Sequence, residues 1–418
     1  MAKKKVKHVE NTRISHIKLL TFKYFCTVKQ FAFFFKALCL VFLVQFLALP
    51  AHADSQAASK MDSVEIGLIT CTPHNEIYSL YGHTALRYHN LRSGDDLIFN
   101  YGVFNFEAPH FVIRFVLGKT DYELGISPYK PFCAYYKQWG CMVTEQVLNL
   151  TNEEKLRIAT ALSINMMPQN RVYRYNFFYD NCSTRPRDII ENNLSGKIIY
   201  EPRKDFEPSF REMIHELTAE HPWTALGNDL LLGLKADFKT NRREQEFLPL
   251  NLMYDFDHAQ IYSNGEYRPL VKDQRVLVEA GIQMVDDTHL FRPLTCAILL
   301  LLGCLCLFYY EKTKKRRQVW PDVMLMALTG LAGCLLFVMF FSEHPTTSTN
   351  LQILLFNPAW LFFIPSVARR KATRYWTVLL VCMLLFLLGS FLQDYAEGME
   401  FLALCLLTRY CSHIINDK

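Results

Sequence analysis

Cys182 has the surroundings that most favour nucleophilic chemistry in this chain. An aromatic segment of extended character, residues 173–179, precedes it, and Pro186 followed by two isoleucines predicts a helix that begins just beyond it. The N–H groups at the start of a helix favour a thiolate over a thiol, and Arg185 and Arg187 add positive charge nearby. The alternative is a cysteine that serves only as a small buried apolar residue.

A thiol nucleophile needs a base, usually histidine, and a polar group that orients this base. Among the histidines of residues 54–292, His83 is distinctive because it follows Gly82 at the point where a loop enters a predicted strand. Asn100 lies on the neighbouring predicted strand, where an orienting amide is needed. A purely structural histidine, and an asparagine that only marks a hairpin end, are the alternatives. We predict that Cys182, His83 and Asn100 converge in space.

Strands are predicted first along the exported part of the chain, and helices afterwards. Alternating branched and aromatic residues predict strands over residues 64–70, 84–88, 97–103 and 143–150. A turn-like stretch, residues 92–96, joins the second and third of these into a hairpin. Thr151, with Glu154 three residues later, predicts the start of a helix that Pro168 ends. This order indicates an α+β fold. The sequence suggests no role for residues 203–262.

Residues 1–53 have the features of an export signal. A long basic segment is followed by an apolar run, residues 37–49, and by the small-x-small sequence AHA at residues 51–53. The mature chain is therefore expected to begin at residue 54, with an uncleaved anchor as the alternative.

The composition changes near residue 292, and residues 293–418 are predicted to form an all-α membrane bundle. Each apolar stretch approaches the ~20 residues that a bilayer requires. We predict about five spans, at residues 294–310, 323–341, 351–367, 375–392 and 401–415. The positive-inside rule puts the basic loops 312–317 and 369–374 in the cytoplasm. Residues 54–292 then lie outside the cytoplasmic membrane, in agreement with the export signal.

Charge and cysteine usage limit the remaining classes of function. The net charge of +5 arises largely from the signal and the cytoplasmic loops, so we expect no nucleic-acid partner. The chain has 13 cysteines but no C-x-x-C pair, and we expect neither a metal site nor a cofactor. In an oxidising compartment, Cys133 and Cys141 could form a disulfide.

Three motifs together resemble those of the Lnb-type bacterial lipoprotein N-acyltransferases, which join a periplasmic domain to C-terminal transmembrane helices. They are YGHTALR at residues 81–87, FNYG at residues 99–102, and the YNF to DNCSTR stretch at residues 175–185. A histidine on an early strand and a later Asn-Cys at a helix start are also similar to the circularly permuted papain-like arrangement of NlpC/P60 and lecithin:retinol acyltransferase-like proteins. The resemblance implies this permuted fold for the exported domain. It also implies that residues 54–292 are a periplasmic catalytic domain attached to the bacterial inner membrane.

The resemblance implies Cys182 as the nucleophile and His83 as the base, and the permuted arrangement suggests Asn100 as the orienting group. The implied reaction moves an acyl chain from a phospholipid to Cys182 as a thioester. The chain then passes to the α-amino group of the N-terminal cysteine of a diacylglyceryl lipoprotein. A membrane-anchored acyltransferase with these partners is the function that we expect.

Further residues are expected to contact the substrates, either at the oxyanion or at the phosphate headgroup. These candidates are Tyr81, Tyr179, Asn181, Arg185, Arg187 and His344. Two other functions stay open on the sequence. One is a thiol hydrolase of the same fold, either phospholipase-like or cell-wall amidase-like, and the other is a non-catalytic membrane scaffold.

Overall fold

The computed structural model describes residues 58–283, 291–371 and 373–416. The expected signal, residues 1–53, lies outside the described residues. Residues 63–418 form one compact unit, in which an α+β domain precedes a helical tail.

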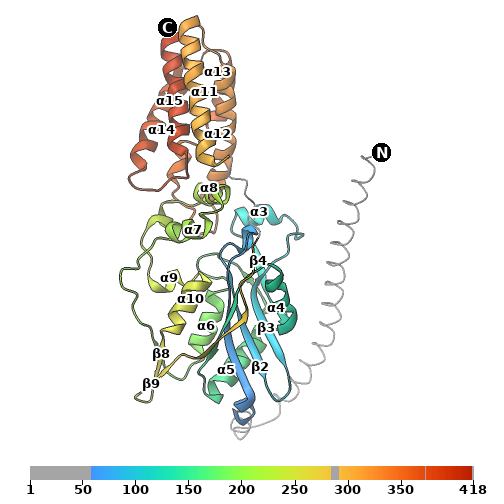
Figure 1. Cartoon of the computed structure of the whole chain (residues 1–418). Helices are drawn as coiled ribbons and strands as arrows, with labels where there is room; N and C mark the ends of the chain where they lie inside the picture. Colours follow the sequence, from blue (N-terminus) through green and yellow to red (C-terminus); the bar gives the residue numbers. More distant parts are fainter. Residues whose placement is uncertain (1–57, 284–290, 372, 417–418) are drawn as a thin grey trace. The chain divides into compact units, whose positions relative to one another are not determined.

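A seven-stranded antiparallel sheet forms the centre of the α+β domain (Figure 1). Its strands lie in the order β10-β5-β1-β2-β3-β4-β6. Their bounds are β1 Val64–Cys71, β2 His83–Asn90, β3 Asp96–Val103, β4 Asp121–Pro128, β5 Val143–Leu148, β6 Val172–Arg174 and β10 Val271–Val278. The predicted hairpin is confirmed as β2–β3, and Asn90 holds its turn by accepting from the N–H groups of Arg92 and Ser93.

Helices cover both faces of the sheet. On one face α4 (Tyr129–Gln138) contributes Phe132 to an apolar cluster with Ile69, Ala85 and Ile98. The opposite face carries α5 (Asn152–Asn165), α6 (Thr184–Asn192) and α10 (Pro249–Asp257) (Figure 1). The predicted capping box at Thr151 begins α5. The expected extended segment 173–179 is a strand only where it overlaps β6, because the chain then turns back through an Asn176–Asp180 bridge.

Most of the segment without a predicted role, residues 203–262, belongs to a small subdomain. It has a three-stranded sheet of β7 (Lys197–Ile199), β8 (Gln260–Ser263) and β9 (Glu266–Pro269). The short helices α7 (Phe210–Thr218), α8 (Pro222–Leu231) and α9 (Arg242–Gln245) lie between β7 and β8 in sequence. Residues of α7 and Phe247 pack with Phe178 in one buried cluster, which supports the chain just before Cys182.

The tail is helical over its described residues. Its helices are α11 (Pro293–Lys314), α12 (Trp320–Met339), α13 (Trp360–Ala368), α14 (Thr373–Gly389) and α15 (Met399–Asn416). By length and apolar composition, α11 and α12 are long enough to cross a bilayer. The expected span 351–367 is instead a 3-10 turn (Leu351–Leu354), a loop and the short α13. The backbone near Pro358 packs so closely against Gly333 that a Cβ atom there would clash with the carbonyl oxygen of Phe356.

The expected disulfide between Cys133 and Cys141 is wrong. Cys133 lies on α4 and Cys141 is buried after it, and both are free thiols. The Sγ atom of Cys141 lies instead 3.9 Å from the carbonyl oxygen of Pro73.

Candidate active site

His83 and Asn100 meet where β2 begins and β3 nears its end. His83 is the first residue of β2 and lies opposite Cys71 of β1, while Asn100 lies opposite Ala85. The three residues His83, Ala85 and Asn100 therefore share the sheet face that α4 covers. The Nε2 atom of His83 lies 3.2 Å from Oδ1 of Asn100, so the predicted pair is in hydrogen-bond contact.

The Asn100 amide determines which imidazole nitrogen is available as a base. Its Nδ2 atom lies 3.2 Å from Oγ of Ser127 and donates to it, which leaves Oδ1 to face the imidazole. An amide oxygen only accepts, so Nε2 of His83 carries the proton in the neutral ring. Nδ1 is then the unprotonated nitrogen, with a lone pair free to accept a proton.

Cys182 lies at the same strand end. The backbone N–H of Thr84, the residue after His83, hydrogen-bonds to the Cys182 thiol. Gly102 of β3 approaches from the other side, and a Cβ atom built on it would be 3.7 Å from Cβ of Cys182. Its φ of +92° also strains any other residue at this position. Tyr136 of α4, whose ring lies nearly parallel to His83 at 6.4 Å, completes the surroundings of the imidazole.

Burial sets the resting protonation state of the thiol and the imidazole. It raises the pKa of Cys182 to about 11, although the N–H groups of Thr84 and of Cys182 itself act in the opposite direction. Burial also lowers the pKa of His83 below its usual 6.5, against a smaller opposite effect of the Asn100 hydrogen bond. Near neutral pH the site therefore holds an uncharged thiol beside an uncharged imidazole. The helix start does not by itself produce the thiolate that the sequence favoured, because desolvation outweighs it.

Asn181 shapes the turn that presents the thiol. Its Oδ1 accepts from the N–H groups of Ser183 and Thr184, and its Nδ2 donates to the carbonyls of Phe177 and Phe247, all at 2.8–2.9 Å. Both amide hydrogens are thereby used inside the protein. The backbone N–H of Cys182 acts on its own thiol and lowers the thiol pKa.

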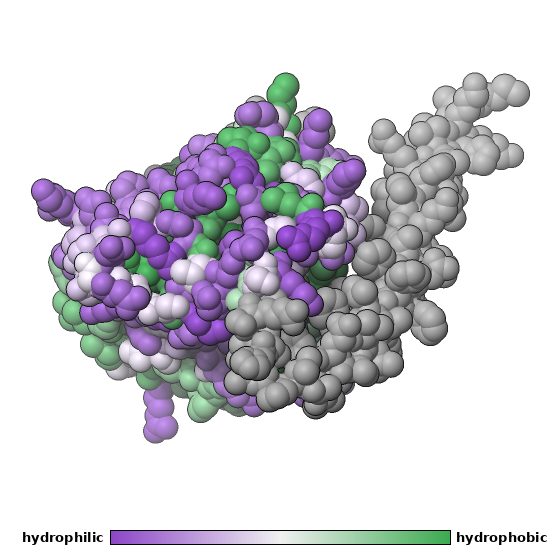
Figure 2. Space-filling model, turned by 90° about the horizontal axis from the view of Figure 1, so that it is seen from below, coloured by the Kyte–Doolittle hydropathy of each residue, from purple (hydrophilic) through white to green (hydrophobic). Residues whose placement is uncertain are grey.

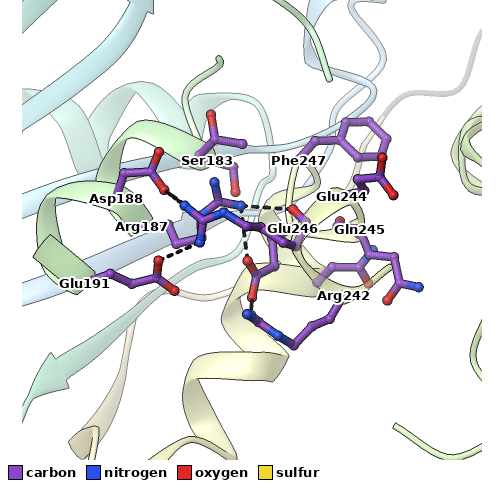
Figure 3. A network of polar contacts seen from close by, with 12 residues as sticks. Ser183, Arg187, Asp188, Glu191, Arg242, Glu244, Gln245, Glu246 and Phe247 are labelled. Atoms are coloured by element: carbon purple, nitrogen blue, oxygen red, sulfur yellow. Dashed lines mark hydrogen bonds and ion pairs between the residues drawn. The ribbon is translucent and has the colours of Figure 1, made fainter. Parts of the chain in front are cut away.

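The two arginines of this motif are engaged with carboxylates. Arg185 donates from Nε and Nη2 to both oxygens of Asp180, at 2.5 and 2.8 Å, and its guanidinium lies 3.5 Å from the ring centre of Tyr173. Arg187 is 3% exposed and reaches Glu246, which is fully buried, at 3.1 Å (Figure 3).

Arg187 joins the cysteine helix to the loop before α10. Its Nε donates to Asp188 and its Nη1 to the backbone carbonyl of Arg243 as well as to Glu246, which Arg242 also pairs with (Figure 3). Burial still raises the pKa of Glu246 to about 7 despite both arginines. The charged form of Glu246 therefore depends strongly on its two arginine partners.

Replacing Arg187 by methionine is expected to destabilise the protein by about 3–5 kcal/mol, because it leaves the buried Glu246 with half of its compensation. The loss should appear as a lower unfolding temperature of the full-length protein in detergent. It should shrink as the pH falls toward 4.5, because a carboxyl whose folded-state pKa is raised stabilises the fold in its protonated form. Arg243→Met is the control, since Arg243 forms exposed pairs with Asp188 and Glu191. Equal effects of the two substitutions would contradict the assignment.

The other residues that were expected to contact substrate, Tyr179, Tyr81 and His344, each have a polar partner within the protein. Tyr179 is 37% exposed, and its hydroxyl lies 3.4 Å from Glu244. The Tyr81 hydroxyl accepts from Nδ2 of Asn228 in α8 at 2.8 Å, which ties the loop before His83 to the small subdomain. His344 donates from Nε2 to the carbonyl of Phe115, at 2.9 Å, and so contacts α3 (Phe111–Val116) rather than the thiol.

The α8 helix links this site to the tail. Asn350 donates to the carbonyl of Leu230, and Gln352 donates to that of Asp229, at 2.8 and 2.7 Å. Asp229 also pairs with Arg211 of α7. A role for part of residues 203–262 follows, since they connect the tail to the loop that carries His83.

Sequence reasoning missed Thr84, Ser127 and Gly102 as parts of the site. Gly102 gave a signal, because a glycine inside a strand often marks a bulge or a close backbone approach. The β3–β4 register indeed shifts between Asn100 and Val103. Ser127 gave no such signal, because its contact with Asn100 depends on the pairing of β3 with β4.

Two surface hollows of the domain do not include the thiol. One, of about 490 Å³, is lined by Tyr179, Asp180 and Arg185 among others, and a larger one of about 570 Å³ lies at Arg203 and Lys239. Across the described ranges, the structure has no group of three or more histidine, cysteine, aspartate or glutamate side chains arranged to hold a metal ion.

The chain matches two family models that together cover most of its length. Residues 51–214 match the Lnb N-terminal periplasmic domain, and residues 285–418 match the Lnb transmembrane domain. No curated protein and no solved structure gave a match. The chain therefore belongs to the Lnb family, with a periplasmic N-terminal domain followed by a transmembrane domain.

Proposed function

We propose that this protein is a lipoprotein N-acyltransferase of the inner membrane that uses Cys182 as its nucleophile. The observation that carries the proposal is the convergence of the Cys182 thiol with the His83–Asn100 pair at one strand end. Membership of the Lnb family, whose members are lipoprotein N-acyltransferases, supports the choice of substrates. A circularly permuted papain-like fold of the sheet domain is part of the same proposal.

In the first step, Nδ1 of His83 accepts the thiol proton while Cys182 sulfur attacks an ester carbonyl of a phospholipid. The carbonyl oxygen becomes an oxyanion, which the N–H of Cys182 stabilises. The ester C–O bond then breaks, and the imidazolium returns its proton to the leaving lysophospholipid oxygen. The product of this step is an acyl thioester on Cys182.

In the second step, the α-amino group of a diacylglyceryl cysteine attacks the thioester. His83 accepts a proton from the amine, the C–S bond breaks, and the thiolate regains that proton. An amide on the lipoprotein and a free Cys182 result. Both substrates are held in lipid, so a transmembrane tail keeps the thiol at the bilayer surface.

The test compares the N-terminal peptides of lipoproteins by mass spectrometry, from cells that lack their own N-acyltransferase, with and without this protein. We expect a third acyl chain, in amide linkage, only when the protein is present. A free α-amine in both samples contradicts the transferase. Free fatty acid released from vesicles without any acylated lipoprotein would instead support the hydrolase.

A further inference from the structure

A row of aromatic rings leads from the tail to the thiol. It starts at His344, whose ring lies 5.9 Å from that of Phe115, and passes along α3 to Phe111. It continues through Phe104 to Tyr122, which stacks on Tyr175 at 4.0 Å. Cε2 of Tyr175 and Cβ of Cys182 both lie within 4 Å of the Cβ position of Gly102, so the row ends beside the nucleophile.

The α3 end of this row exposes apolar side chains to an unusual degree. Val112 is 72% exposed, Ile113 is 60% exposed, and Phe106 next to the helix is 65% exposed. By contrast, hydrophilic residues dominate the face in Figure 2, where apolar residues occur in separate patches. An apolar surface of this kind on a periplasmic domain marks contact with a partner or with lipid.

Several hydrogen bonds hold α3 against the loop that follows α12. Oγ of Ser342 donates to the carbonyl of Val116, and the N–H of Glu343 donates to that of Leu117, at 2.8 and 2.9 Å. Gly118 approaches the loop so closely that a Cβ there would lie 2.8 Å from the nitrogen of His344. The exposed Phe341 directly precedes this loop at the end of the transmembrane helix. These contacts place α3 beside the loop that follows α12.

We propose that α3 is immersed in the outer surface of the inner membrane, and that the aromatic row guides a phospholipid acyl chain from the bilayer to Cys182. The occupant of the exposed face is thus lipid and not a second protein. Arg114 and Lys119 flank the apolar residues, and each is partly exposed beside a carboxylate, Asp121 and Glu343 respectively, as suits a polar headgroup region. The acyl route depends on the proposed acyl transfer, whereas the immersion of α3 does not.

The immersion is tested with the full-length protein in vesicles of phosphatidylethanolamine and phosphatidylglycerol. A photo-cross-linking amino acid is placed at Ile113, at Leu302 in α11, or at Leu91 in the β2–β3 turn, which is 59% exposed and lies at the opposite end of β2. We expect lipid adducts at Ile113 and Leu302 but not at Leu91. Adducts at Leu302 alone would overturn the inference, and they would do so whatever the enzyme's activity.

The acyl route is tested by the double substitution Val112→Asp and Ile113→Asp. We expect the ratio of Cys182 acylation by vesicle phospholipid to acylation by a short water-soluble ester to fall about ten-fold, because two apolar side chains that contact lipid are replaced by carboxylates. Leu91→Asp should leave this ratio unchanged. An unchanged ratio in the double variant overturns the route, whereas failure of wild-type Cys182 to react with either ester would instead reject the proposed function.

Discussion

Replacing Cys182 by alanine is expected to abolish acyl transfer, with a loss on the order of 10⁴-fold or more, because no other group can carry the acyl chain. The measurement is the intact mass of the purified protein after incubation with phospholipid vesicles. The wild-type protein should gain one acyl group, and hydroxylamine should remove it, as expected of a thioester. The alanine variant should gain none.

The matched control for this experiment is Cys133→Ala. Cys133 is a partly exposed free thiol on α4, and it lies outside the proposed mechanism. Burial raises its pKa as well, so a general reactivity of thiols in this domain would show at both positions. An acyl adduct that survives in Cys182→Ala and disappears in Cys133→Ala would reject Cys182 as the nucleophile.

The sequence was sufficient for the central hairpin and for the pairing of its two polar residues. Alternation of branched and aromatic residues is a local signal, and the turn around Gly94 fixes which strands are neighbours. Once β2 and β3 pair, Ala85 lies opposite Asn100, and His83 two residues earlier points to the same face. The contact between His83 and Asn100 then follows from strand geometry alone.

Tertiary packing determined what the sequence could not predict. The sequence favours a thiolate at Cys182, because helix starts and arginines are visible in it and desolvation is not. Asn181 is a residue type that can stabilise an oxyanion, and this is why the sequence suggested it. Its amide group instead donates both hydrogens to backbone carbonyls, those of Phe177 and the distant Phe247. The span expected at 351–367 has the right composition, but the loop near Pro358 interrupts it.

The separation of α8 from the sheet motifs in sequence explains why residues 203–262 gave no signal. Asn228 lies 147 residues from Tyr81, yet its amide donates to the Tyr81 hydroxyl. Asp229 beside it receives a hydrogen bond from Gln352 in the tail. The position of the His83 loop therefore depends on contacts that neither a motif nor a hydrophobic period encodes.

Replacing His83 by glutamine is expected to slow acylation of Cys182 by about 10²–10⁴-fold, because glutamine keeps a polar side chain but cannot accept the thiol proton. In the wild-type protein the neutral imidazole is the base, and burial lowers its pKa below 6.5. The acylation rate should therefore be constant from about pH 7 upward toward the thiol pKa of about 11, and it should fall only below pH 6.5. In the glutamine variant this acidic limb should disappear, and the residual rate should rise with pH as the thiolate forms.

The variant Asn100→Ala tests how the His83 imidazole is oriented, because it removes the hydrogen bond of the imidazole and leaves the base itself in place. The Asn100 hydrogen bond raises the pKa of His83, so its loss should move the acidic limb to lower pH. The plateau rate should fall roughly five-fold, in keeping with the loss of one hydrogen bond of about 1 kcal/mol that also fixes the tautomer. Rapid-quench acylation kinetics over pH 5–10 measure both quantities. An acidic limb that stays in place in both variants would show that a group other than His83 accepts the proton, and it would remove the base from the mechanism proposed here.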